Sequence, residues 1–295
     1  MEIKKTFGGS DPLKKMRGSD PVKLVALDLD GTLLHDDGTL SGANARAIRS
    51  AMDRGVEVAA CSGRPYVGIP FEKLSGTGIR WIITANGAAI YRYPEKELIY
   101  EECMPRETME TLVPMFHERG IHFDSFIDGL AYGHNDTKYK IPMLGVTPAI
   151  REYITNTRIF VDDVLTYLKP EDHRFQKITL NYCSLDDPDR DWTIELLKNY
   201  PEIRPVTAGF CNIEISSAGT SKSKALAILA DRLGIPMSQT MACGDAQNDL
   251  DIIQAAGIGV GMANAQQCVL DACDYITTSN NEDGVARAFE KFILS

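Results

Sequence analysis

The chain has 295 residues, with 31 lysines and arginines against 41 aspartates and glutamates, which gives a formal net charge of −10. At about 150 residues per domain this length indicates two domains. Its 44% hydrophobic and 24% charged residues exclude a disordered, collagen-like or disulfide-stapled chain. The acidic balance weighs against nucleic-acid binding, which needs a basic surface.

The sequence also disfavours a secreted or membrane-bound protein. Its seven cysteines include no Cys-x-x-Cys pair, which favours small thiols in a reducing compartment. The five histidines include no His-x-x-x-His pair, so their spacing disfavours a zinc site. No apolar run approaches the ~18 residues that span a bilayer, and the N-terminus lacks a signal-peptide pattern. We expect a cytoplasmic protein with no membrane partner.

The first third of the chain alternates strand and helix patterns. Residues 1–20 are rich in Gly, Ser, Asp, Pro and Lys and are expected to form a flexible extension. Short apolar runs predict strands at 22–27, 56–60 and 81–84, and a helix is expected at 41–54 between an N-cap at Ser41 and a C-cap at Gly55. This alternation is typical of βαβ units in a parallel sheet.

The middle of the chain has a different pattern, and the alternation returns after it. The middle predicts helices at 105–119 and 192–199 and strands at 123–126, 130–132 and 175–182. The last part predicts strands at 212–215, 240–243, 257–260 and 275–276 and helices at 222–233, 250–256, 264–271 and 283–293. We therefore predict an α/β core formed by 21–102 and 210–295, with an α+β domain inserted at 103–209.

Polar residues follow the predicted strands of the core. They are Asp28 and Asp30, then Ser62 and Gly63, then the run 244–249 (Gly-Asp-Ala-Gln-Asn-Asp). Ligands of open α/β sheets bind at the carboxyl ends of the strands, so these groups are expected at one edge. Carboxylate oxygens are the ligands that Mg²⁺ prefers. The backbone N–H of Gly63 and the Ser62 hydroxyl can bind a phosphoryl oxygen.

The same residues suit attack on phosphorus. A carboxylate such as Asp28 can accept a phosphoryl group and form an aspartyl phosphate. Mg²⁺ and Lys222 would offset the repulsion between carboxylate and phosphate. Asp30, two positions on, could protonate the leaving alkoxide and later deprotonate water.

Residues 28–32 (Asp-Leu-Asp-Gly-Thr), Ser62, Lys222 and 244–249 together resemble the haloacid dehalogenase-like (HAD) superfamily, and more narrowly its Cof-type phosphatase branch. The resemblance covers nearly everything from about residue 22 to the end and is weakest in the insertion. It implies a Rossmann-like parallel-sheet HAD core with an inserted α+β cap domain that closes over the core and contacts the leaving group.

The resemblance also implies a role for each motif residue. Asp28 would be the nucleophile and a metal ligand, and Asp30 the general acid/base that also gives its carbonyl to the metal. Thr32 would steady the carboxyl of Asp30. The remaining expected roles are phosphate binding by Ser62, Gly63 and Lys222, metal binding by Asp245, and support in or near the outer shell of the metal by Asn248 and Asp249.

Several points stay open. The branch commonly has Gly after its motif lysine, but Ser223 follows Lys222 here, so Lys224 is an alternative phosphate ligand. Arg64 can point at substrate or at solvent, and Asn86 can lie near the site or form a tight turn with Gly87. A polar and aromatic stretch of the insertion either contacts the leaving group or forms a solvated hairpin; it contains His122, Asp124, Asp128, Tyr132, His134, Asn135 and Asp136.

The sequence thus predicts an Mg²⁺-dependent HAD-type phosphoric monoester hydrolase. It would act on small phosphate monoesters, such as sugar phosphates or phosphorylated cofactors, through an aspartyl phosphate on Asp28. The alternatives are a phosphomutase on the same scaffold and a non-catalytic sensor of a phosphate ligand. The sequence fixes neither the substrate nor the oligomeric state.

Overall fold

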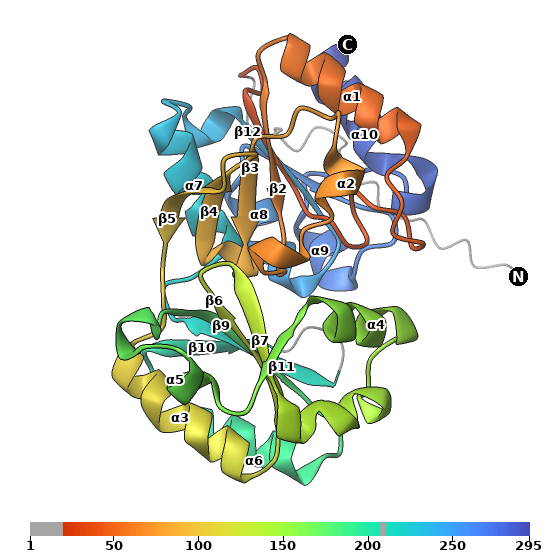
Figure 1. Ribbon diagram of the computed structural model, residues 1–295. Coiled ribbons are helices and arrows are strands. Elements are labelled where there is room, and N and C mark those ends of the chain that lie inside the picture. The colour runs from red at the N-terminus through yellow and green to blue at the C-terminus, as the bar shows by residue number, and fades with distance from the viewer. Residues whose placement is uncertain (1–19, 207–210) are drawn as a thin grey trace, which may run out of the picture.

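The computed structural model describes residues 20–206 and 211–295. The predicted extension at 1–20 therefore lies outside the described residues, apart from Asp20. The described chain forms two sheets, one above the other in Figure 1, each with its own helices. All seven cysteines are unpaired. Among the described helices, none is long and apolar enough to cross a membrane.

The first sheet is the predicted α/β core. It has eight strands in the order β14-β13-β12-β1-β2-β3-β4-β5. Its parallel strands are β1 (Leu24–Leu27), β2 (Glu57–Cys61), β3 (Trp81–Thr84), β12 (Thr240–Gly244), β13 (Ile258–Gly261) and β14 (Tyr275–Ile276). An antiparallel hairpin of β4 (Ala89–Arg92) and β5 (Glu97–Glu101), which the sequence did not predict, extends one edge.

Helices cover both faces of this sheet because its strands are apolar on both faces. Val25 and Leu27 of β1 belong to a core cluster with α1 (Gly42–Asp53), α2 (Phe71–Leu74) and α10 (Gly284–Phe289). Leu24 and Ala26 belong to another with α7 (Lys222–Arg232), α8 (Leu250–Ala255) and α9 (Gln267–Ala272). Burial on both faces explains why the strands form continuous apolar runs. Ser41 caps α1 as predicted.

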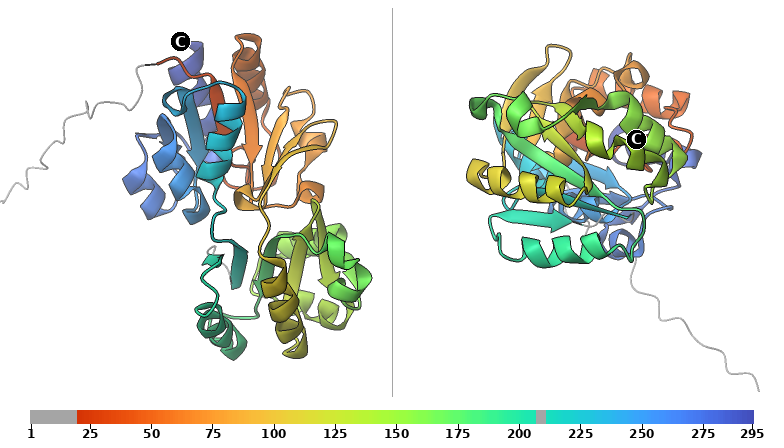
Figure 2. Two further views of the ribbon diagram at one scale, coloured as in Figure 1. Left: turned by 90° about the vertical axis from the view of Figure 1, so that its left-hand side faces the viewer. Right: turned by 60° about the horizontal axis from the view of Figure 1, so that its bottom comes forward.

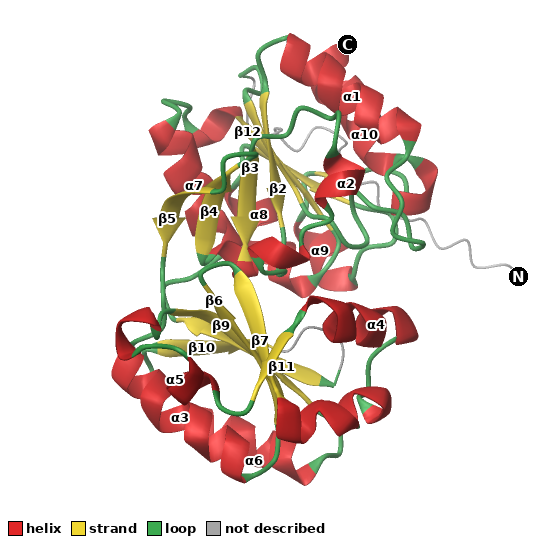
Figure 3. Ribbon diagram, in the orientation of Figure 1, coloured by secondary structure: helices red, strands yellow, loops and turns green. Residues whose placement is uncertain are grey.

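The second sheet belongs to the inserted domain. Its six strands run in the order β10-β11-β9-β6-β7-β8. They are β6 (His122–Ile127), β7 (Leu130–His134), β8 (Ile159–Val161), β9 (Phe175–Asn181), β10 (Ile203–Val206) and β11 (Asn212–Ser217). Helices α3 (Arg106–Glu118), α5 (Val164–Tyr167) and α6 (Pro188–Leu197) lie on the side away from the first sheet, and α4 (Pro148–Thr157) lies beside the junction of the two parts (Figures 1 and 3).

One strand lies in a different sheet from the one we expected. The strand predicted at 212–215 was assigned to the core, but β11 pairs antiparallel with β9 in the second sheet. Its residues Ile213 and Ile215 alternate into the apolar cluster of the insertion. A strand with this alternation fits either sheet, so the sequence pattern did not show where the chain returns to the core. We predicted the return at residue 210, but the second sheet continues to Ser217.

The chain crosses between the two sheets twice, and the crossings are tied together (Figure 2). The first crossing follows β5 and the second follows β11. The hydroxyl of Ser217 donates a hydrogen bond to Glu102 Oε1 at 3.0 Å. Lys224, in the first turn of α7, forms an ion pair with the same carboxylate. Glu102, on the first crossing, therefore contacts both the second crossing and the helix α7 that follows it.

Candidate active site

The polar residues that follow the core strands gather at one edge of the sheet, as predicted. Asp28 directly follows β1, and its backbone N–H donates to the carbonyl of Cys243 on the neighbouring strand β12 at 3.0 Å. Gly31 has a φ of +79°, and a Cβ there would lie 2.6 Å from Asp245 Oδ2. The loop after β1 can thus approach the loop after β12 only with glycine at this position.

Lys222 is the cation at the centre of the site. Its Nζ donates to Asp28 Oδ1 at 2.5 Å and to Asp249 Oδ1 at 2.6 Å, and the residue is 1% exposed. Ser221 caps α7 and so fixes where Lys222 enters the site. Lys224 instead pairs with Glu102. Of the two candidate lysines, only Lys222 lies beside Asp28.

The acidic groups of the site repel one another. Burial, and then the charge of Asp249, raise the pKa of Asp28 well above its usual range. Burial raises the pKa of Asp245 to about 6. Burial alone would lower the pKa of Lys222, but the carboxylates of Asp249 and Asp28 outweigh it and raise that pKa. One buried lysine does not neutralise this cluster, which favours the binding of a further cation.

Asp28, Asp245 and Asp249 each offer a carboxylate oxygen, and these oxygens lie within 4.8 Å of one another. An all-oxygen set of this kind fits Mg²⁺. Asp249 Oδ1 is bonded to Lys222, and its Oδ2 accepts from the backbone N–H of Asp245 at 3.1 Å and of Ala246 at 3.0 Å. Asp28 and Asp245 are therefore better placed than Asp249 to hold the cation.

Thr32 does not contact the carboxyl group that we expected it to steady. Its hydroxyl donates to Asp245 Oδ1 at 2.8 Å, because the loop after β1 turns Thr32 toward β12. Asp30 points the other way, and its two oxygens accept from Arg64 Nε at 2.8 Å and Nη2 at 2.7 Å. Arg64 thus points into the site, and its backbone N–H donates to the hydroxyl of Ser62 at 3.2 Å.

The comparisons with known proteins agree with this geometry. The family model described as haloacid dehalogenase-like hydrolase matches residues 25–289. The chain belongs to the haloacid dehalogenase-like hydrolase family. The resemblance to this superfamily and its Cof-type branch, and the predicted α/β fold with a cap domain, are thereby confirmed.

Similar proteins cover almost the whole of this HAD hydrolase. The 5-amino-6-(5-phospho-D-ribitylamino)uracil phosphatase YcsE of Bacillus subtilis is 32% identical over 277 residues, covering 92% of this chain and 96% of the relative. Phosphatase YwpJ of B. subtilis is 27% identical over 291 residues, covering 92% and 100%. The structure of a haloacid dehalogenase-like hydrolase from B. subtilis has a TM-score of 0.78 at 26% identity, covering 91% and 99%.

The cap of this HAD hydrolase contributes side chains that sequence reasoning missed. Lys177 of β9 is 2% exposed, and its Nζ donates to the carbonyl of Gly63 at 2.7 Å and to Glu214 Oε1 at 2.6 Å. The other oxygen of Glu214 accepts from Asn86 Nδ2 at 2.6 Å. Asn86 also accepts from Asn248 Nδ2 at 3.3 Å. Asn86 therefore lies at the site and links cap to core.

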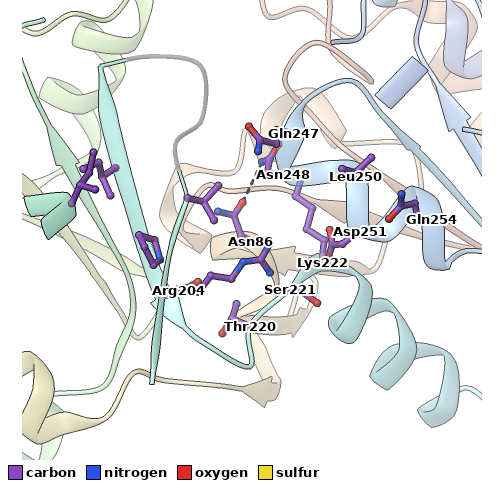
Figure 4. Close-up of a pocket in the computed structure, with 15 residues that line it drawn as sticks. Asn86, Arg204, Thr220, Ser221, Lys222, Gln247, Asn248, Leu250, Asp251 and Gln254 are labelled. Carbon is purple, nitrogen blue, oxygen red and sulfur yellow. Dashed lines mark hydrogen bonds between the residues drawn. The ribbon is translucent and has the colours of Figure 1, made fainter. Parts of the chain in front are cut away.

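A cavity of about 450 Å³ opens between the HAD core and the cap (Figure 4). Asn86, Lys222 and Asn248 line its core side, and Arg204 of β10 reaches into it from the cap side. The polar residues around this space come from both parts of the chain. Its lining includes Lys222 but none of Asp28, Asp30, Ser62 or Asp245, so the cavity lies beside the acidic cluster.

The polar stretch of the cap forms a hairpin of β6 and β7, as considered, but much of it is buried. His122, Asp124 and His134 are each at most 1% exposed, whereas Asp128, Asn135 and Asp136 are exposed. Asp124 Oδ1 pairs with Arg158 Nε at 3.1 Å, and both side chains are buried. The ring of Tyr153 on α4 contacts the guanidinium groups of both Arg158, at 4.8 Å, and the core residue Arg64, at 4.7 Å.

Two cysteines lie beside motif residues of the HAD core. Cys61 precedes Ser62 and Cys243 precedes Gly244, and both are 1% exposed. Burial raises the pKa of both thiols, that of Cys243 to about 12. Because a thiol must ionise to act as a nucleophile, both residues are packing residues at the strand ends, as expected.

Replacing Lys222 with alanine is expected to lower turnover by roughly 10²- to 10³-fold, the usual effect of removing one preorganised donor from a charged site. It would also leave the carboxylates of Asp28 and Asp249 unpaired, which costs about 3–5 kcal/mol for a buried pair. Lys224→Ala is the matched control, because it removes an exposed lysine two positions away and should retain most activity. Steady-state kinetics and thermal unfolding of both variants check this; the reverse order of effects would assign the phosphate to Lys224.

Proposed function

We propose that this HAD hydrolase is an Mg²⁺-dependent phosphatase that hydrolyses small phosphate monoesters through an aspartyl phosphate on Asp28. The observation that carries the proposal is the contact between the buried carboxylate of Asp28 and the Nζ of Lys222 at 2.5 Å, beside Asp245 and Asp249. A nucleophilic carboxylate needs neighbouring cations to approach a phosphate dianion. Lys222 supplies one, and the carboxylates of Asp28 and Asp245 can hold another.

Each side chain of the site then has a task. One oxygen of Asp28 attacks phosphorus and the bond to the ester oxygen breaks. Lys222, with the hydroxyl of Ser62 and the N–H of Gly63, binds the phosphoryl oxygens. Bound Mg²⁺ would supply positive charge to the transferring group. Asp30 gives its proton to the leaving oxygen, and then takes a proton from the water that cleaves the acyl phosphate.

The substrate class to test follows from the relatives. The cavity of about 450 Å³ beside Lys222 is large enough for a sugar or a small cofactor, and it adjoins the acidic cluster without including Asp28. The B. subtilis relative YcsE is named for a substrate that carries a phosphate on a ribityl chain. We infer that sugar phosphates, polyol phosphates and phosphorylated cofactors are the esters to test.

The experiment is phosphate release from a panel of such esters, with Mg²⁺ and with chelator. Release that depends on Mg²⁺ supports the proposal, and the rank order begins to identify the substrate. An isomeric phosphate ester in place of inorganic phosphate would indicate a phosphomutase. A folded, Mg²⁺-loaded protein that binds an ester and leaves it intact would indicate a sensor.

The acidic cluster predicts how Mg²⁺ stabilises the protein at different pH. Because burial raises the pKa of Asp245 to about 6, the metal-free folded state holds a proton that the unfolded state releases near pH 4. Stability of the metal-free protein therefore falls as the pH rises through this window. Mg²⁺ should raise Tm more at pH 7.5 than at pH 5.5, where the proton competes.

Thermal unfolding with Mg²⁺ and with chelator at both pH values checks this expectation. Asp245→Asn removes the titrating group and should lose most of the Mg²⁺-dependent shift at either pH. An equal shift at both pH values in the unsubstituted protein would contradict the assignment of Asp245 to the cation.

A further inference from the structure

A second group of metal-ligand side chains lies in the cap. His117 near the end of α3, His134 at the end of β7 and Asp136 just after β7 each offer one ligand atom, and these atoms lie within 4.8 Å of one another. The sequence disfavoured a zinc site because it contains no His-x-x-x-His pair. That pattern finds only two histidines on neighbouring turns of one helix. The fold brings together two histidines from different elements.

His134 is buried, and its ring nitrogens are poorly satisfied. The residue is 0% exposed, neither Nδ1 nor Nε2 makes a hydrogen bond of good geometry within the described structure, and the main chain of Asp162 lies beside the ring. Its ring packs against Phe123 at 4.4 Å and against His117 at 4.8 Å. A buried imidazole without partners is unfavourable, and leucine or phenylalanine would fill the same space without that cost. Even with the main chain of Asp162 beside the ring, at least one nitrogen of His134 is left for a ligand.

The other two ligands provide access from solvent. His117 Nε2 lies 2.6 Å from Asp136 Oδ2, and the two side chains are 28% and 50% exposed. A cation between them takes the place of the shared proton. Zinc bonds of about 2.0–2.2 Å in a tetrahedral site bring ligand atoms closer together than the 4.8 Å limit within which these atoms lie. Some of the ligand side chains must therefore be able to rotate toward the ion. His117 and Asp136 meet this requirement.

We propose that the cap binds a transition-metal ion such as Zn²⁺ through His117, His134 and Asp136, with water as the fourth ligand. Two imidazoles and one carboxylate favour Zn²⁺, Co²⁺ or Ni²⁺ over Mg²⁺, which prefers the all-oxygen cluster of the core. His134 lies two residues after Tyr132 on β7, so it shares the face that packs against α3, away from the core. The ion would therefore join α3 to the end of β7 and take no part in catalysis.

The test uses the full-length protein, stripped of metal and then held in excess Mg²⁺ to occupy the core cluster. Co²⁺ is titrated as a spectroscopic probe, and Zn²⁺ affinity is measured by competition with a chromophoric chelator. We expect one ion per chain, with visible Co²⁺ bands and no thiolate charge-transfer band, since no cysteine belongs to the site. His117→Gln and Asp136→Asn should each weaken binding by at least about 10-fold, because even outer partners of a metal site cost roughly 10- to 100-fold.

His134→Phe should abolish binding while phosphate release continues, and the solvent-accessible His117→Gln variant keeps the test valid if His134→Phe fails to fold. His35→Gln is the matched control: His35 also pairs with a carboxylate, that of Asp283 at 3.8 Å, and should not affect binding. Absence of binding, equal affinity in the His117 and Asp136 variants, or a thiolate spectrum would overturn the proposal.

Discussion

Replacing Asp28 with asparagine is expected to lower phosphate release by at least about 10⁴-fold, a loss typical of removing a catalytic nucleophile. The amide lacks the negative oxygen that attacks phosphorus. The fold should remain intact, because burial and Asp249 already disfavour the charge of Asp28. Lys222 keeps its contact with Asp249 in this variant. The metal-free variant should therefore unfold at the same temperature as the unsubstituted protein or higher.

Acid quenching during turnover gives a direct measurement of the same role. The unsubstituted enzyme should carry phosphate that survives acid and is released by hydroxylamine, as an acyl phosphate is, whereas Asp28→Asn should carry none. Asp186→Asn, an identical change at an exposed position of the cap, is the control and should behave like the unsubstituted protein. Near-normal turnover by a folded Asp28→Asn variant would show that Asp28 is not the nucleophile.

Asp30→Asn is expected to lower turnover of alkyl phosphates by roughly 10²- to 10⁴-fold, the range for loss of a general acid–base group. The leaving alkoxide then departs without a proton. The rate of the first step, transfer of the phosphoryl group to Asp28, should fall much less with p-nitrophenyl phosphate, because its leaving group is stable as an anion. The second step, hydrolysis of the aspartyl phosphate, would still lack the base that activates water. The aspartyl phosphate should therefore accumulate.

Rapid-mixing kinetics separate these steps. Asp30→Asn with p-nitrophenyl phosphate should release a burst of about one p-nitrophenolate per active site, followed by slow turnover. Because the side chain of Asp30 is largely exposed and, among the described residues, bonds only to Arg64, the substitution should change Tm little. Equal losses with both classes of ester and no burst would point to another proton donor.

The positions of the core carboxylates could be predicted because parallel strands align their carboxyl ends. Asp28 and Asp245 follow short apolar runs that were predicted to be strands, so their meeting at one edge required no knowledge of side-chain direction. The direction of each side chain was not predictable in this way. Thr32 turns to Asp245 and Asp30 turns to Arg64, because the left-handed turn at Gly31 separates them.

The cap side of the site was not predictable from local pattern. Lys177 lies in an alternating strand, where a lysine normally indicates the solvated face, and only the core packed against that face makes it buried. Arg158 and Tyr153 belong to a segment whose helix α4 and strand β8 were not predicted, since β8 has three residues. Burial at an interface between two parts of a chain depends on their docking, which sequence periodicity does not encode.

The two crossings joined at Glu102 bear on how the cap could move. Because the two crossings are joined through Glu102, we expect any movement of the cap to be a rotation about the line through them, with little sliding over the core. Every opening should therefore follow one arc, which separates Lys177 from the carbonyl of Gly63 in each cycle. The entry of substrate and the exit of phosphate would share that single motion, and with it a common rate limit.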